Sequence, residues 1–461
     1  MKIKAPQISI PVDDPFKNDL LNRRENAVIL EQLISTIEEP IVIAIDSPWG
    51  TGKTIFIKMF MQYLNNQGFS CLYFNAWEND FNEDPLFSLI GEVGKGIDSI
   101  KNDKETKQKY LSEAKKLGAY FLKKSLPVAL KLVTAGVVDI KELADLAENI
   151  AKEKIDKYEE DRKTIQSFKK SLSEFVKESA CPNVKGKTKP LIFFIDELDR
   201  CRPDYAVKLM EKAKHFFNVE NIIFFLAIDK EQIGHSIRSI YGVGMDVDGY
   251  LRRFIDLDYH LPDPSNNIFC NALFAKFGFD QYFKNDADKD RFIRILSKLF
   301  TIFEFTLRVQ EQCFSQLSLA LRTISSDHRV YPFLLGILIS LKAKYLDLYK
   351  DFVKEKVGPE NVLKYIRELP GGNSFLENVE DNDGTVLEAY LIICCLDKSV
   401  DIINQYKNID GDDKLPDDMK KRRQLILNIL RSPDMRCNYN TLKNIAKSID
   451  ISERFFNKNE E

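Results

Sequence analysis

Five short runs of β-branched, aliphatic and aromatic residues interrupt a chain that is otherwise patterned like a series of helices. Each run is brief and is bounded by polar or turn residues, which is typical of strands buried on both faces of a parallel sheet. Because helical periodicity fills the stretches between the runs, we predict an α/β three-layer sandwich with a parallel five-stranded sheet. The predicted strands are residues 41–46, 71–77, 191–196, 222–229 and 254–261.

The spacing of these runs predicts how the chain is divided into domains. The gap between the second and third runs is too long for one crossover, and residues 98–188 are rich in lysine and glutamate at helical spacing. We therefore expect a sheet domain formed by residues 1–97 and 189–262, with a helical insertion at 98–188. The remainder, 263–461, is predicted to be all-helical, with a lid followed by a C-terminal domain. Strongly apolar helices are expected at 268–277, 291–303 and 331–349.

The first predicted strand runs directly into the segment SPWGTGKT, residues 47–54, after which a helix begins. This segment has the pattern of a phosphate-binding P-loop, except that Ser47 stands where the first glycine is usual. Glycines let such a loop curl so that its N–H groups converge on phosphate oxygens, and the helix N-terminus adds a favourable dipole. A glycine turn beside a surface lysine is the alternative, and the strand–loop–helix context disfavours it. The predicted nucleotide-binding residues are Trp49, Gly50, Thr51, Gly52, Lys53 and Thr54, with Lys53 on the β- and γ-phosphates and Thr54 on Mg²⁺.

A second motif, LIFFIDELDR at residues 191–200, ends an apolar strand in two acids. Asp196 is in position to hold Mg²⁺, and Glu197 is in position to polarise the water that attacks the γ-phosphate. A plain acidic turn is the alternative, which the upstream P-loop disfavours. A glutamate at this place is typical of NTPases that use a carboxylate base, and in these proteins the strand 222–229 lies between the two motif strands. Asp229 would then be a polar sensor of the γ-phosphate.

Several sequence blocks in order resemble the KAP family of P-loop NTPases. The combination of FNAWE with IDELDRC is the most specific part of this resemblance. The blocks extend over about two-thirds of the chain and are DPFKNDLLNR (14–23), SPWGTGKT (47–54), FNAWEND (74–80), FIDELDRC (194–201), FFLAIDKEQI (224–233), YLRRFIDL (250–257) and TLRVQEQ (306–312).

The resemblance implies further roles at matching positions. It assigns phosphate, metal and catalytic functions to the residues already named, and adenine contacts to the segment around Leu20–Arg23. Arg253 resembles an arginine finger, and Arg308 resembles a sensor arginine in the helical lid. Trp77 and Glu78 match a signature of unassigned role, and Trp77 could equally be a buried core aromatic.

The arginines also have simpler interpretations. Arg252 and Arg253 could be surface charges at a helix end, and Arg308 could pair with an acid. Arg200 is interpreted as a structural residue that neutralises Asp199.

Composition limits the choice of partners and compartment. The formal net charge of −3 gives no global argument for nucleic-acid binding, and acids interrupt the lysine-rich stretches 101–124 and 152–189. The apolar stretch 126–138 contains Lys131 and is shorter than the roughly 20 residues of a membrane span. A buried or amphipathic helix is favoured there. The eight cysteines form no CxxC pair, which favours reduced thiols in a reducing compartment, so we expect a cytoplasmic protein without stable membrane insertion.

These observations predict a Mg²⁺-dependent ATPase that acts as a nucleotide-driven assembly switch. Its expected partner is another copy of the chain, or a protein that carries an effector activity. The family resemblance suggests a setting in anti-phage defence. Two alternatives stay open, which are a slowly hydrolysing ATP-gated scaffold and a nucleic-acid sensor or motor.

Overall fold

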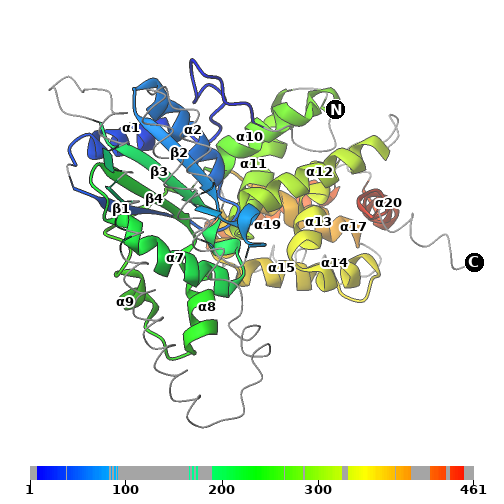
Figure 1. The fold of residues 1–461 in the computed structure, drawn as a ribbon. Helices are drawn as coiled ribbons and strands as arrows, with labels where there is room; N and C mark the ends of the chain where they lie inside the picture. Colours follow the sequence, from blue (N-terminus) through cyan, green and yellow to red (C-terminus); the bar gives the residue numbers. More distant parts are fainter. Residues whose placement is uncertain are drawn as a thin grey trace, which may run out of the picture. The chain divides into compact units, whose positions relative to one another are not determined.

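The computed structural model describes residues 8–82 except Glu38, residues 189–450 with short gaps, and a few helical residues between 85 and 174. The gaps after residue 189 are 264, 284–285, 324–330, 379, 396–415 and 432–436. The chain forms two compact units, Ser9–Pro262 and Asp263–Glu461 with Met1–Ile8 (Figure 1). The predicted insertion 98–188, including the stretches 101–124, 126–138 and 152–189, lies almost entirely outside the described residues.

The first unit is built on a five-stranded parallel sheet with the strand order β2-β3-β4-β1-β5. This confirms the predicted fold class, with β4 between the two motif strands β1 and β3. The predicted second and fifth strands were too long, since β2 ends two residues before Trp77 and β5 spans only four residues. The strands are β1 (Ile41–Asp46), β2 (Ser70–Asn75), β3 (Leu191–Asp196), β4 (Ile222–Ile228) and β5 (Leu257–His260).

Helices cover both faces of the sheet, which explains why β3 and β4 are buried along their whole length. On one face, Phe60 of α2 (Lys53–Asn66) packs edge-on against the stacked rings of Phe194 and Phe225. On the other face, Phe193 and Phe224 pack in a cluster with α7 (Pro203–Phe217) and α8 (Lys230–Tyr241). Figure 1 shows α2 and α7 on opposite sides of the strands. The continuous apolar runs of the sequence therefore reflect burial from both sides.

The remaining elements of the first unit are α1 (Arg24–Ile34), η1 (Trp77–Asn79), η2 (Leu198–Arg200) and α9 (Val247–Leu251). The described part of the second unit is helical throughout, as predicted. Its elements are α10 (Asn266–Phe277), η3 (Phe279–Tyr282), α11 (Asp286–Ile302), α12 (Leu307–Thr323), α13 (Pro332–Lys344), α14 (Leu346–Val353), α15 (Pro359–Glu368), α16 (Gly372–Glu377), α17 (Asp383–Cys394), α19 (Asp417–Arg431) and α20 (Tyr439–Ile449).

The apolar run 331–349 forms two helices where the sequence predicted one. The helix breaks at Tyr345, whose backbone angles of φ −132° and ψ 65° are not helical. The ring of Tyr345 packs against Phe303 and Tyr365, so tertiary contacts accompany the break. Within the described residues, no helix has both the length and the apolar character needed to cross a membrane.

A buried charge cluster joins α11 to α17 in the second unit. The carboxylate of Asp383 is fully buried and accepts hydrogen bonds from Arg294 at 2.6 Å and Lys298 at 2.9 Å. Burial by itself would raise the pKa of Asp383, but these hydrogen bonds lower it below its ordinary value.

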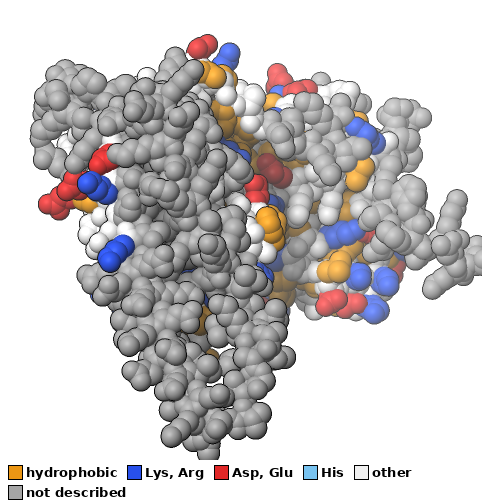
Figure 2. Space-filling view, viewed as in Figure 1, with side chains coloured by type: hydrophobic (Ala, Val, Ile, Leu, Met, Phe, Trp, Pro, Cys, Tyr) orange, Lys and Arg blue, Asp and Glu red, His pale blue; other side chains and the backbone are white. Residues whose placement is uncertain are grey.

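On the surface seen in Figure 2, acidic and basic side chains of the described residues are interspersed, as is typical of solvated faces.

Candidate functional site

The loop between β1 and α2 has the backbone that a P-loop requires. Gly50 and Gly52 have φ values of 81° and 87°, a region that side-chain-bearing residues rarely adopt. Gly52 is the residue before the first helical residue, Lys53, so the loop delivers the lysine directly at the N-terminus of α2. Free amide groups and the dipole of a helix N-terminus favour phosphate at this place.

Ser47, which replaces the first glycine of the motif, supports the loop from inside. Its side chain is buried, and its hydroxyl lies 2.6 Å from the hydroxyl of Thr51. Thr51 donates in turn to the carbonyl of Pro48 at 2.8 Å. The departure from the motif is therefore accommodated by hydrogen bonds within the loop. The buried side chain of Thr51 belongs to this support.

Lys53 is almost completely buried, although it carries the charge expected to bind phosphate. Its ammonium group donates to the carbonyl oxygen of Ser47 at 2.5 Å and lies 3.7 Å from Oδ2 of Asp199. Burial lowers the pKa of Lys53, and the nearby carboxylates of Asp199, Asp229, Asp196 and Asp46 oppose this shift. The lysine thus sits where the acids that end three strands converge.

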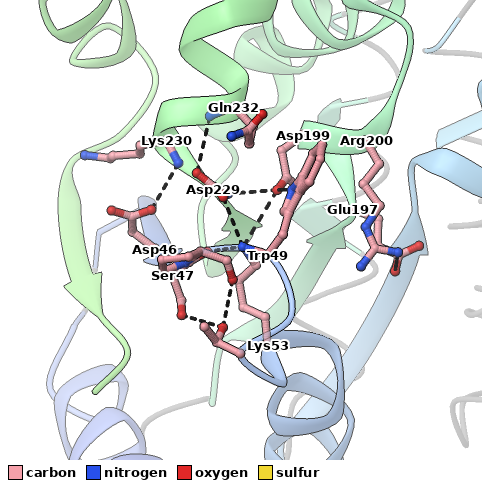
Figure 3. A network of polar contacts seen from close by, with 12 residues as sticks. Asp46, Ser47, Trp49, Lys53, Glu197, Asp199, Arg200, Asp229, Lys230 and Gln232 are labelled. Carbon is pink, nitrogen blue, oxygen red and sulfur yellow. Dashed lines mark hydrogen bonds and ion pairs between the residues drawn. The ribbon is translucent and has the colours of Figure 1, made fainter. Parts of the chain in front are cut away.

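Asp229 connects the P-loop to the end of β4. Its Oδ2 accepts a hydrogen bond from the backbone N–H of Trp49 at 3.1 Å. Its Oδ1 accepts from the N–H groups of Glu231 and Gln232, so it is also the N-cap of α8. Figure 3 shows this carboxylate between the loop and the helix. Its role as a γ-phosphate sensor stays a prediction. In the structure, its hydrogen bonds connect the P-loop to the start of α8.

Asp196 and Thr54, the two predicted metal ligands, lie near each other. The carboxylate of Asp196 is buried at the end of β3 and accepts a hydrogen bond from the hydroxyl of Tyr73 at 3.0 Å, while the hydroxyl of Thr54 lies close enough to lower the pKa of this carboxylate. Burial raises the pKa of Asp196, and these two hydroxyls oppose the shift. Burial also raises the pKa of Tyr73, which keeps its hydroxyl a donor. Sequence reasoning missed Tyr73, because its position beside Asp196 depends on the pairing of β2 with β3.

Glu197, the predicted catalytic base, is held by two other side chains. Its Oε1 lies 2.8 Å from a guanidinium nitrogen of Arg200, and its Oε2 accepts a hydrogen bond from Asn75 at 3.2 Å. Its backbone has a φ of 58°, which is uncommon for a residue with a side chain and is often found at functional sites. Sequence reasoning missed Asn75. It also assigned Arg200 to Asp199, whereas the structure pairs Arg200 with Glu197.

Trp77 is half exposed at the start of η1, so the alternative of a buried core aromatic is wrong. The guanidinium carbon of Arg200 lies 5.7 Å from the centre of its ring. Arg200 therefore touches both the catalytic candidate and a solvent-facing aromatic of the FNAWE block.

The other predicted residues belong to elements different from those that form this network. Arg252 and Arg253 are exposed in the turn between α9 and β5. Arg308 is exposed in the first turn of α12, which belongs to the second unit. Arg23 is buried before α1 and donates to the carbonyl of Pro262 at 3.3 Å. The finger, sensor and adenine-contact roles stay predictions.

Comparison with known proteins agrees with this geometry at the level of family. A model described as the KAP family P-loop domain matches residues 24–429. The uncharacterized protein MJ0182 of Methanocaldococcus jannaschii is 28% identical over 181 residues, which cover 34% of this chain and 90% of that protein. The solved structure of the Aeropyrum pernix ORC2 protein in ADPNP–ADP complexes aligns at 14% identity over 93% of this chain and 98% of that one, with a TM-score of 0.30. Drosophila ORC bound to GC-rich DNA and Cdc6 aligns at 12% identity over 95% and 63%, with a TM-score of 0.32. Both TM-scores are too low to support an inference.

Proposed function

This chain belongs to the KAP family of P-loop NTPases, and from that premise we propose that it binds ATP with Mg²⁺ and hydrolyses the bond to the γ-phosphate. The observation that carries the proposal is the convergence of three groups at the carboxyl edge of the sheet. These groups are the ammonium of Lys53, the Thr54–Asp196 pair and the carboxylate of Glu197. In parallel sheets, ligands bind at this edge.

The P-loop residues would bind the phosphates. The backbone of Gly50 and Gly52 lets loop amides face the phosphate oxygens without obstruction by side chains. The ammonium of Lys53 would exchange its contact with the Ser47 carbonyl for the β- and γ-phosphates. This exchange replaces a neutral acceptor by a charged one, which is the stronger hydrogen-bond partner.

Thr54 and Asp196 fit a magnesium ion, because a hydroxyl and a buried carboxylate lie near each other there and both are hard oxygen ligands. When bound, Mg²⁺ neutralises charge on the β- and γ-phosphate oxygens. Tyr73 would hold Asp196 in orientation through its hydroxyl. Glu197 would then accept a proton from the attacking water, once its carboxylate leaves Arg200 and Asn75.

The proposed biological role is a nucleotide-driven assembly switch. ATP binding would favour one assembled state, and hydrolysis would reset it. Exposed Arg253 supports this role, because a surface guanidinium can reach a phosphate bound to a second copy of the chain. A setting in anti-phage defence is part of the same proposal and is supported by the family resemblance alone.

Replacing Lys53 by alanine tests nucleotide binding. We expect Lys53→Ala to weaken the affinity for ATP by about 100-fold or more, because charge-assisted hydrogen bonds to the phosphates are each worth about 1.5–3 kcal/mol. Isothermal titration with ATP and Mg²⁺ measures the change. Lys208→Ala, which removes an exposed lysine of α7, is the matched control and should bind as the wild type does. Equal affinity in the wild type and in Lys53→Ala would remove the P-loop assignment.

A second candidate function, a slowly hydrolysing ATP-gated scaffold, is favoured by one observation. Both carboxylate oxygens of Glu197 have partners, so the base is restrained in this conformation. A protein that remained in this state with ATP bound would keep its assembled form for long periods. The two candidates share the same site and differ in how readily Glu197 is released.

Removing Arg200 tests this restraint. We expect Arg200→Ala to raise basal ATP turnover several-fold, because the loss of about 1 kcal/mol of charge-assisted pairing frees the base. Steady-state phosphate release at saturating ATP measures the effect. Arg202→Ala, a neighbouring exposed arginine that contacts Asp80, should leave turnover unchanged. A fall in turnover with Arg200→Ala would mean that the arginine supports catalysis instead of restraining it.

A further inference from the structure

Asp199, the second aspartate of the IDELDR motif, lies at the centre of a network to which the sequence assigned no function (Figure 3). The residue lies on η2 and is 6% exposed. Its Oδ2 accepts hydrogen bonds from the indole Nε1 of Trp49 at 2.5 Å and from the backbone N–H of Asp229 at 3.0 Å. The same oxygen lies 3.7 Å from the ammonium of Lys53.

The three partners belong to different parts of the nucleotide site. Trp49 is the exposed tip of the P-loop, Asp229 is the junction of β4 with α8, and Lys53 is the first residue of α2. A buried carboxylate is costly unless it is paired and hydrogen-bonded. Burial raises the pKa of Asp199, and Lys53 and Trp49 oppose that shift. The carboxylate and the loop therefore stabilise each other.

The pairing with Lys53 distinguishes Asp199 from a purely structural acid. The indole and the amide already provide two hydrogen bonds to one oxygen, and neither requires a negative charge. The ammonium of Lys53 is the group that would bind the phosphates, so a carboxylate beside it competes with them. Hydrogen bonding and charge should thus have opposite effects on ATP affinity.

We propose that Asp199 is a positioning residue of the nucleotide site, which fixes the P-loop tip through Trp49 and retains Lys53 until the phosphates of ATP displace it. This inference rests on the proposed ATP site and adds a regulator of its affinity. The hydrogen bonds pre-organise the loop and strengthen ATP binding. The charge competes for the lysine and weakens binding. The restraint on Glu197 involves Arg200 and Asn75 and is separate from this network.

Two substitutions of Asp199 separate the two effects. Asp199→Asn keeps one acceptor oxygen for the indole and the amide but removes the charge, so we expect ATP to bind about tenfold more tightly. Asp199→Ala removes the acceptor as well, so we expect binding about tenfold weaker than in the wild type, because the loop tip is released. Trp49→Phe keeps an aromatic ring but loses the hydrogen-bond donor, and it should also weaken binding. Asp204→Asn on α7 is the control, since it removes an exposed aspartate that pairs with Lys208.

The same variants have a spectroscopic signature that needs no nucleotide. The chain has two tryptophans, so a Trp77→Phe background leaves Trp49 as the only emitter. In that background, acrylamide should quench Trp49 more strongly in Asp199→Ala than in the parent, while Asp199→Asn should stay close to the parent. Thermal unfolding followed by circular dichroism verifies that each variant folds. If Asp199→Ala does not fold, Trp49→Phe provides the affinity comparison.

The outcomes distinguish this inference from the proposed function. The inference is supported if Asp199→Asn raises ATP affinity, Asp199→Ala or Trp49→Phe lowers it, and the quenching pattern is as expected. Shifts of the same sign, or unchanged quenching in Asp199→Ala, overturn it even if the wild type binds ATP normally. If the wild type does not bind ATP, the proposed function fails, and the affinity role of Asp199 fails with it, whatever quenching reveals about the loop.

Discussion

Glutamine in place of Glu197 is expected to leave ATP binding intact and to lower the turnover number by about two to four orders of magnitude, the range that general-base catalysis supplies. Glutamine has nearly the same shape as glutamate but cannot accept the proton of the attacking water. The hydrogen bond with Asn75 can persist after an amide flip, so the loop geometry should be preserved. Steady-state phosphate release at saturating ATP and ATP titration on the same preparation measure the two quantities.

The control for this experiment is Asp204→Asn, which makes the same kind of carboxylate-to-amide change on the surface of α7. It should leave both quantities as they are in the wild type. Equal hydrolysis by the wild type and Glu197→Gln would remove Glu197 from the mechanism. A loss of ATP binding in Glu197→Gln would instead indicate that the residue supports the fold of the site.

The parts of the site that lie close together in the chain could be predicted from the sequence. The P-loop is a continuous segment between β1 and α2, and its glycines have the positive φ values that the motif requires. Asp196 ends its strand as predicted, because a buried apolar run stops where a charged residue must reach the sheet edge. The position of β4 between β1 and β3 followed from the acid after Asp196, which is typical of one division of NTPases.

Contacts between distant segments could not be predicted in this way. Asn75 reaches Glu197 across 122 positions of sequence, because β2 pairs with β3 and places Asn75 beside Asp196. Nothing in the local pattern of β2 indicates that register. The predicted partner of Arg200 was wrong for a related reason. Adjacency of Arg200 to Asp199 in the sequence does not show that the Asp199 side chain points toward Lys53. A buried charge finds its partner through tertiary packing.

Helix length was overestimated where packing overrides a continuous apolar pattern. The run that became α13 and α14 has no glycine or proline at the break, so periodicity alone favours one helix. The break at Tyr345 coincides with ring contacts to Phe303, in the turn after α11, and to Tyr365 of α15. Such a position can be located only once the neighbouring helices are known.

The exposed position of Arg253 leads to the expectation that hydrolysis depends on self-association. The residue lies in the turn before β5, on the surface of the sheet unit, and a guanidinium there can stabilise charge on a γ-phosphate bound to a neighbouring copy. An arginine supplied in this way accelerates phosphoryl transfer by about 10³–10⁵-fold. Specific activity should therefore rise with protein concentration, and Arg253→Ala should remove most of that rise.

Mixing two inactive variants separates a role in trans from a role within one chain. Arg253→Ala retains an intact Glu197, and Glu197→Gln retains an intact Arg253, so some mixed interfaces would combine both groups. We expect partial recovery of phosphate release in the mixture, with neither variant active alone. Arg252→Ala removes the adjacent exposed arginine and is the matched control. It should release phosphate as the wild type does, alone or in a mixture. Activity per molecule that is flat across concentration, with no recovery on mixing, would place Arg253 within its own chain or outside the mechanism.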